Sequence, residues 1–154
     1  MLLTDMLKLE QIKVPLAATD KQGAIQELVD LLAGQGKLLD RDKAYQAVLE
    51  REQTRTTGIG EGVAIPHGKT PAVGDLVIAL GKAPDGVDFE SIDGKPVTLI
   101  LLLLSPSDRT GLHIQALARI SRLISLDAFR KKMASAQTAE EIFQVIQQQE
   151  QSLQ

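Results

Sequence analysis

The chain of 154 residues contains no cysteine and no tryptophan. Without cysteine it can form no disulfide, no thiolate nucleophile and no cysteine-ligated zinc site. Aromatic residues make up only 3% of the chain, so the core has to be built from Leu, Ile, Val and Ala. So few rings also argue against the stacking platforms that bind single-stranded nucleic acid. The absence of cysteine fits the reducing cytosol, and we expect a cytoplasmic protein.

Basic blocks and long apolar runs are missing as well. The net charge is −3, which gives little electrostatic support for nucleic-acid binding. The most apolar run, Leu99 to Leu104, is far shorter than the roughly 20 residues that cross a bilayer. The first eight residues lack the basic and apolar regions of a signal peptide. We therefore expect no membrane insertion, and a single domain over residues 1–154 with a core of its own.

The spacing of apolar residues predicts an α/β fold in which helices flank a mixed sheet, a single-domain sandwich. We expect N-caps at Asp20 and Asp40, and a capping box that begins at Thr138. Residues 83–95 read as a loop in which Val87 and Phe89 are candidates for a brief strand pairing, and the polar tail from about 147 is expected to fray. The predicted strands span residues 9–17, 63–65, 76–82 and 97–104. Two predicted helices begin after Asp20 and after Asp40, and they end at Gly34 and at about Gln53. Three more are predicted over 109–125, over 127–133 and after Thr138.

Residues 56–69 stand out because they combine three alternating glycines, a short apolar run and Pro66-His67-Gly68. Pro66 should end the strand, since proline has no N–H for a ladder. His67 should then lie at a strand end, on a turn with little bulk around it. The glycines do not fit the dinucleotide fingerprint G-x-G-x-x-G, because position 63 is Val and a strand follows. The chain also lacks a P-loop and a G-x-S-x-G elbow, so we expect no nucleotide cofactor.

The chain has two histidines, His67 and His113. A metal site would need both of them and carboxylates from distant segments, which is weak support, and we expect no metal. A neutral imidazole can instead attack phosphorus directly. Such a site needs cations or donors for the phosphoryl oxygens, and Arg51 and His113 are candidates.

Each candidate also has an ordinary structural interpretation. Arg51 lies at the C-terminus of a predicted helix and could be a solvated side chain that interacts with the helix dipole. His113 could be a helix-face histidine with a partly buried ring. Lys69 could attract a phosphoryl group or simply be solvated. Glu61 should face solvent, because a second negative charge near a phosphoryl group would oppose phosphorylation.

Three segments together resemble one protein family. They are Arg51-Glu52, residues 57–68 (TGIGEGVAIPHG) and residues 111–118 (GLHIQALA). They are similar to the enzyme IIA domain of the fructose/mannitol class of the bacterial phosphoenolpyruvate-dependent phosphotransferase system (PTS). Weaker similarity extends over nearly the whole chain. The resemblance implies the family's mixed sheet flanked by helices, in agreement with the pattern of apolar residues.

The resemblance implies a phosphotransferase that works as a phosphohistidine carrier. His67 would accept a phosphoryl group from the small carrier HPr, or from its nitrogen-branch equivalent, and pass it to an enzyme IIB. Arg51 would hold the phosphoryl oxygens, and His113 would contact the active ring and the phosphate. The alternative is a nitrogen-branch regulatory enzyme IIA, whose phosphorylation state controls binding to target proteins. A third interpretation, a structural domain with a decayed site, conflicts with the intact set of three residues.

Overall fold

The computed structural model describes residues 2–153, and its centre is a six-stranded mixed sheet. The strand order is β1-β5-β6-β3-β2, and β4 also pairs with β6. Strands β5 and β6 are antiparallel, and so are β2 and β3, whereas β1 runs parallel to β5 and both β3 and β4 run parallel to β6. The strands are β1 (Ile12–Lys13), β2 (Gly58–Gly60), β3 (Val63–Ala64), β4 (His67–Lys69), β5 (Val77–Val87) and β6 (Val97–Ser105).

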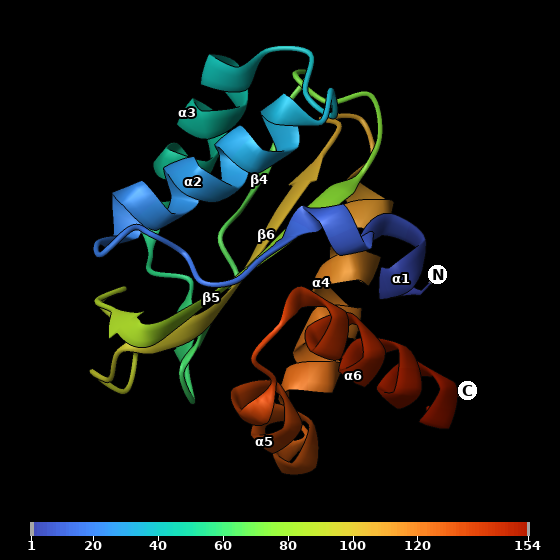
Figure 1. Cartoon of the computed structure of the whole chain (residues 1–154). Coiled ribbons are helices and arrows are strands. Elements are labelled where there is room, and N and C mark those ends of the chain that lie inside the picture. The colour runs from blue at the N-terminus through green and yellow to red at the C-terminus, as the bar shows by residue number, and fades with distance from the viewer. Residues whose placement is uncertain (1, 154) are drawn as a thin grey trace.

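Helices cover both faces of the sheet, so the predicted fold class is confirmed (Figure 1). Helices α2 (Lys21–Gly34) and α3 (Arg41–Thr54) lie on one face. The other face carries α1 (Leu3–Met6), α4 (Thr110–Ile124), α5 (Asp127–Ser135) and α6 (Ala139–Ser152). The three predicted N-caps are also confirmed, because the side chains of Asp20, Asp40 and Thr138 each accept a hydrogen bond from the backbone N–H three residues later. The reciprocal half of the capping box predicted at Thr138 is wrong, because the Glu141 carboxylate accepts from Gln137 N instead of from Thr138 N.

Strand β6 separates two apolar cores. Leu99, Leu101 and Leu103 pack on the side of α4, α5 and α6, whereas Ile100, Leu102 and Leu104 pack on the side of α2 and α3. Successive side chains of a strand point to opposite faces, so a run that is apolar at every position needs cover on both sides. This explains why β6 shows no polar alternation, and it fixes which face each neighbouring side chain takes.

Two strand predictions differ from the structure. The expected strand over 9–17 is only β1, preceded by a 3₁₀ turn, η1 (Leu9–Gln11). The buried amide of Gln11 donates to Met6 O and Ile78 O, and Pro15 offers no N–H beyond β1. Conversely, β5 continues to Val87 through part of the predicted loop, because Val87 pairs with Val97 of β6. Helix α1 was not predicted.

The prediction that the tail from about 147 frays is wrong for the described residues. Helix α6 continues to Ser152, and Glu150 in its last turns is only 1% exposed. The Glu150 carboxylate accepts hydrogen bonds from Leu3 N and Thr4 N and pairs with Arg119. The polar composition of the tail therefore gave no sign that the Glu150 carboxylate is buried and joins the two ends of the chain. Residues 1 and 154, the limits of the predicted domain, lie outside the described range.

No helix formed by residues 2–153 is long and apolar enough to cross a membrane.

Candidate functional site

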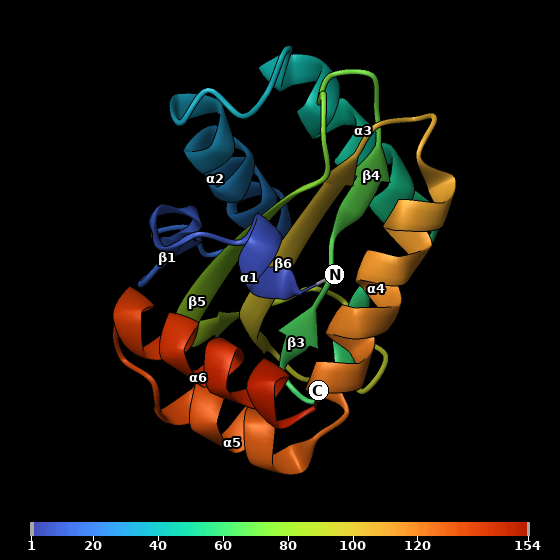
Figure 2. The same ribbon diagram turned by 90° about the vertical axis from the view of Figure 1, so that its right-hand side faces the viewer.

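His67 opens strand β4 at the side of the sheet where α3 and α4 approach each other (Figure 2). It pairs in parallel register with Leu103 of β6. Paired residues on adjacent strands share a face, so the His67 ring lies on the α4 side, like Leu103. The prediction of a turn at this position is therefore wrong. The chain stays extended past Pro66, whose carbonyl accepts from Leu103 N at 3.0 Å.

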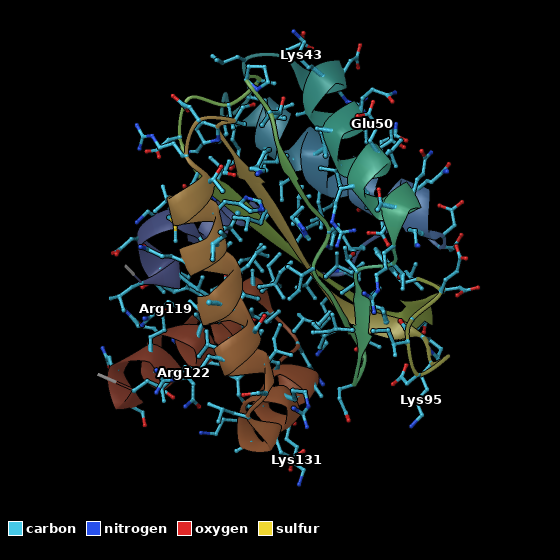
Figure 3. The ribbon with its side chains drawn as sticks, turned by 180° about the vertical axis from the view of Figure 1, so that it is seen from behind. Lys43, Glu50, Lys95, Arg119, Arg122 and Lys131 are labelled. Atoms are coloured by element: carbon cyan, nitrogen blue, oxygen red, sulfur yellow. The ribbon has the colours of Figure 1, made fainter. Side chains whose placement is uncertain are left out.

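Gly68 explains how α3 comes close to the histidine. A Cβ atom at this position would lie 3.2 Å from both Ala47 C and Val48 N in the backbone of α3. Such a contact is tighter than ordinary packing, so only glycine lets the helix backbone rest on β4. Strand β4 runs between α3 and α4 when the molecule is seen from behind (Figure 3). Because α3 packs so closely on β4, the last turns of α3, which carry Arg51, lie beside His67.

The His67 ring is held in one orientation. Its Nδ1 lies 2.8 Å from the carbonyl oxygen of Ile65. A carbonyl can only accept, so Nδ1 carries the proton and Nε2 of the neutral ring keeps its lone pair. Burial lowers the pKa of His67, and the Arg51 guanidinium lowers it further; the Ile65 bond and the Glu52 carboxylate oppose this in part. The ring is therefore neutral near pH 7, with a free nitrogen that can act as a nucleophile.

His113 lies across from His67 on the fourth residue of α4. The two ring centroids are 5.4 Å apart, and the ring planes are tilted by 54°. His113 is only 6% exposed. Burial lowers its pKa to about 4, with contributions from His67 and Lys69. The structure thus brings together the two histidines that the sequence predicted, both in the neutral form.

Arg51 lies in the last turn of α3, as predicted. Its Nη1 donates to Arg55 O at 2.8 Å, which holds the guanidinium over the end of the helix. Its charge acts on His67, whose pKa it lowers. A guanidinium placed beside a neutral imidazole offers fixed donors for an anion bound to that ring. Arg51 and the two histidines therefore form one cluster, drawn from α3, β4 and α4.

Two residues of the site were not predicted from the sequence. Glu52 is 7% exposed and accepts hydrogen bonds from Thr57 N at 2.9 Å and Thr57 Oγ1 at 2.6 Å. Its carboxylate also pairs with Lys21 at 3.0 Å, so it anchors the chain between α3 and β2. Ser105 is fully buried, and its Oγ lies 2.5 Å from His113 Nδ1. A hydroxyl directly after the apolar run from Leu99 to Leu104 was the signal that could have identified it.

The other residues of the glycine-rich segment lie apart from the histidines. A Cβ on Gly58 would meet Ser91, and one on Gly60 would approach Asp93. Gly60 and Gly62 have positive φ angles of 98° and 76°, as the turn between β2 and β3 requires. Gly58, Gly60 and Gly62 therefore shape the segment from β2 to β3 and do not surround His67. Glu61, in the same turn, is exposed as predicted.

The described residues offer no metal cage at this site. Within residues 2–153, no group of three or more His, Asp or Glu side chains could hold a metal ion. A cavity of about 580 Å³ is lined by Thr98, Lys82 and Gln137 among others. Thr98 is five residues before Leu103 on β6, which places this cavity about 16 Å along the strand from His67. A half-buried histidine suits a protein partner better than an enclosed small molecule.

The sequence matches one protein family over most of its length. Residues 5–149 match the family described as "Phosphoenolpyruvate-dependent sugar phosphotransferase system, EIIA 2". The chain is 38% identical over 148 residues to the PTS system fructose-specific EIIABC component of Bacillus subtilis (strain 168). That match covers 96% of the chain but only 23% of the relative. The chain is thus similar to one part of a larger protein.

Two further relatives are matched over most of their own length. The PTS system fructose-specific EIIA component of Haloferax volcanii is 37% identical over 138 residues, which cover 90% of each chain. A nitrogen regulatory protein of Bradyrhizobium diazoefficiens is 37% identical over 147 residues, which cover 94% of each chain. The two kinds of relative are therefore equally similar to this chain.

Solved structures confirm the fold. The crystal structure of the nitrogen regulatory protein IIA-Ntr from Neisseria meningitidis superposes with a TM-score of 0.86 at 30% identity, over 94% of this chain and 98% of that one. The enzyme IIAMTL of Escherichia coli, in its complex with phosphorylated enzyme IIBMTL, gives a TM-score of 0.78 at 22% identity, over 92% and 99%. The second likeness concerns the fold alone.

Proposed function

The chain belongs to the EIIA 2 family of the phosphoenolpyruvate-dependent sugar phosphotransferase system, and we propose that it carries the phosphoryl group on Nε2 of His67. The observation that carries the proposal is the hydrogen bond from His67 Nδ1 to Ile65 O. It leaves Nε2 as the one ring nitrogen with a free lone pair. Burial and the Arg51 charge lower the pKa of His67 and keep that lone pair available near neutral pH.

In the proposed reaction, His67 first accepts one phosphoryl group from the donor and then passes it to the acceptor. The lone pair of His67 Nε2 attacks phosphorus on the donor, a P–N bond forms, and the bond from phosphorus to the donor breaks with its electron pair left on the donor atom. In the second transfer, the acceptor attacks the same phosphorus in line, a bond from phosphorus to the acceptor forms, and the P–N bond breaks with its electron pair left on Nε2. No proton has to leave His67 in the transfer, because Nδ1–H stays bonded to Ile65 O throughout.

Arg51 and His113 would stabilise the charge that gathers on the transferred group. The phosphoryl oxygens carry the negative charge of the transition state, and fixed donors at those oxygens are the main means of lowering the barrier. Arg51 supplies a permanent cation from α3, and His113 supplies a ring N–H from α4. A second carboxylate would oppose phosphorylation, and the exposed Glu61 lies in the turn between β2 and β3, away from the ring.

The partners can be inferred from this chemistry. The donor would be HPr or its nitrogen-branch equivalent, and the acceptor would be an enzyme IIB, as in the E. coli complex. Both would present a reacting side chain to His67. Phosphoenolpyruvate is an intracellular metabolite, so the exchange would take place in the cytoplasm.

Labelling with phosphoenolpyruvate, enzyme I and HPr tests the proposal. We expect one phosphoryl group per chain, labile in acid and stable in alkali, and none on a His67→Ala variant. His113→Ala is the matched control, because it removes the only other histidine; it should still be labelled, but more slowly. A His67→Ala variant that labels like the wild type would overturn the assignment.

Regulation in the nitrogen branch is the second candidate, because a nitrogen regulatory protein is as similar to this chain as a fructose-specific EIIA component. The two functions share His67 and differ in the fate of the phosphoryl group. A transport component passes its phosphoryl group to a fructose-type enzyme IIB in a purified mixture. A regulatory protein keeps the group and binds targets differently in its two states, since a switch needs a difference in affinity. The genes beside its own, for a permease or for a nitrogen sigma factor, separate the two cases.

A further inference from the structure

Ser105 is the last residue of β6 and lies directly beneath His113. It pairs in register with Lys69, two residues beyond His67 on β4. It lies on the same face of β6 as Leu103, because side chains two apart on a strand point the same way. This face is the α4 side. Ser105 is fully buried, whereas the neighbouring Ser107 is exposed.

The Ser105 hydroxyl and the His113 ring are each other's partners. Ser105 Oγ lies 2.5 Å from His113 Nδ1. Among the side-chain hydrogen bonds within residues 2–153, neither group has another partner. The direction of this bond therefore decides where the single proton of the neutral His113 ring lies.

The arrangement in which Ser105 donates to His113 has the lower free energy. If Nδ1–H donated to Oγ, the buried hydroxyl proton would have no acceptor, which is unfavourable. If Oγ–H donates to Nδ1, both groups are paired and the ring carries its proton on Nε2. A protonated ring would force the first arrangement, but burial lowers the pKa of His113 to about 4, so the ring is neutral at pH 7.

We infer that Ser105 is a positioning residue, which holds His113 with Nε2–H free to donate to the phosphoryl group on His67. This inference rests on the function proposed above and adds a role for a residue that does not touch the phosphoryl group. The two rings are 5.4 Å apart, and Nε2 is the only ring atom of His113 left for a hydrogen bond. Without Ser105 the ring can flip or shift its proton and present a lone pair to the anion instead.

The state of His113 can be measured before any kinetics. The chain has only two histidines, so a long-range ¹H–¹⁵N spectrum of protein labelled at histidine contains two ring patterns, and the His67→Ala variant identifies that of His113. At pH 7 we expect His113 to be protonated at Nε2, with Nδ1 a hydrogen-bonded acceptor. In Ser105→Ala the Nδ1 resonance should move downfield, towards a free acceptor nitrogen. A wild-type ring protonated at Nδ1, or an unchanged Nδ1 resonance in Ser105→Ala, would refute the inference.

The kinetic test compares two buried serines. Ser105→Ala should lower kcat for phosphorylation by phospho-HPr roughly tenfold, with KM for HPr unchanged, because orientation of one donor is lost. Ser91→Ala is the matched control: its buried hydroxyl has no hydrogen-bond partner within residues 2–153, and it lies beside Gly58, away from the two histidines. It should leave both constants unchanged. A Ser105→Ala variant with wild-type kcat, or with a changed KM alone, would contradict the role.

A double-mutant cycle separates positioning from a general packing effect. In a His113→Ala background, Ser105→Ala should have little further effect on the rate, because the residue acts through His113. An undiminished tenfold loss in that background would show that Ser105 acts independently. Ser105→Cys keeps a weak donor in nearly the same volume and should fall between Ser105 and Ala in rate. If circular dichroism shows that Ser105→Ala does not fold, Ser105→Cys replaces it in the kinetic test.

The inference and the proposed function fail in different ways. If His67→Ala were still phosphorylated, the proposed function would be refuted. The ¹⁵N spectrum would still show whether Ser105 donates to His113. If His67→Ala lost all label while Ser105→Ala kept the wild-type rate and spectrum, only the role of Ser105 would fall.

Discussion

The imidazole of His67 donates from Nδ1 to the carbonyl oxygen of Ile65, 2.8 Å away and two residues earlier in the chain. Pro66 lies between them and has no N–H of its own. The bond fixes both the orientation and the tautomer of the ring. It therefore decides which nitrogen faces the partner surface.

This bond predicts phosphorylation at Nε2 and not at Nδ1. Phosphorylation at Nδ1 would break the bond to Ile65 O and leave a buried carbonyl without its donor, which costs about 1–3 kcal/mol. Nuclear magnetic resonance of the ¹⁵N-labelled, phosphorylated protein distinguishes the two isomers by the nitrogen that couples to phosphorus. A phosphoryl group on Nδ1 would contradict this geometry.

Arg51→Ala should lower the rate of phosphoryl transfer roughly a hundredfold, because it removes a fixed cation from the phosphoryl oxygens. Stability should change by about 0.5 kcal/mol or less, since the side chain is only half-buried. Arg55→Ala is the control, because it removes an equal charge from an exposed position at the same helix end and should affect transfer much less. A large loss of stability in Arg51→Ala, measured by urea unfolding, would mean that the arginine is structural.

The low pKa of His113 makes the folded state sensitive to acid. The folded protein resists protonation of His113 until the pH falls to about 4, whereas the unfolded chain takes up this proton near its ordinary value of 6.5. Between these values the unfolded state binds more protons, so the free energy of unfolding falls as the pH falls. The full difference amounts to about 3 kcal/mol for His113, and the lowered pKa of His67 acts in the same direction.

His113→Gln tests this assignment, because glutamine keeps a donor and does not titrate. Urea unfolding of both proteins between pH 7.5 and 4.5 should show a shallower pH dependence in the variant. Carboxylates contribute equally to both proteins and cancel in the comparison. Identical slopes would show that His113 titrates normally in the folded protein.

Glu150→Ala should reduce the free energy of unfolding by about 2–4 kcal/mol. The substitution leaves Leu3 N, Thr4 N and Arg119 without their buried acceptor. Gln148→Ala is the control, because Gln148 is exposed on the same helix, and it should cost less than about 0.5 kcal/mol. Equal, small losses for both variants would mean that the end of α6 frays, as its composition alone predicted.

Some features could be predicted from short stretches of sequence because the forces that create them are local. Asp20, Asp40 and Thr138 cap helices through bonds to backbone groups three residues away. The apolar spacing of α4 and the continuous apolar run of β6 report burial directly. The motif around His67 is also local, and with Arg51 and His113 it was sufficient to identify the family and the candidate site.

Other features depended on contacts between distant residues, which no local pattern specifies. The face taken by His67 is set by its register with Leu103, and the approach of Arg51 depends on the bare backbone of Gly68 against Ala47. The Glu150 carboxylate looked like part of a solvated tail until its partners, at the opposite end of the chain, were known.

The sequence by itself therefore determined the fold class, the family and the three residues that could handle a phosphoryl group. Only the tertiary structure decided which nitrogen of His67 is free, and that Ser105 lies under His113. Hydrogen-bond direction and tautomer depend on distances of a few tenths of an ångström between separate elements. Such distances arise from the packing of α3, β4, β6 and α4 together, and the spacing of residues along the chain does not contain them.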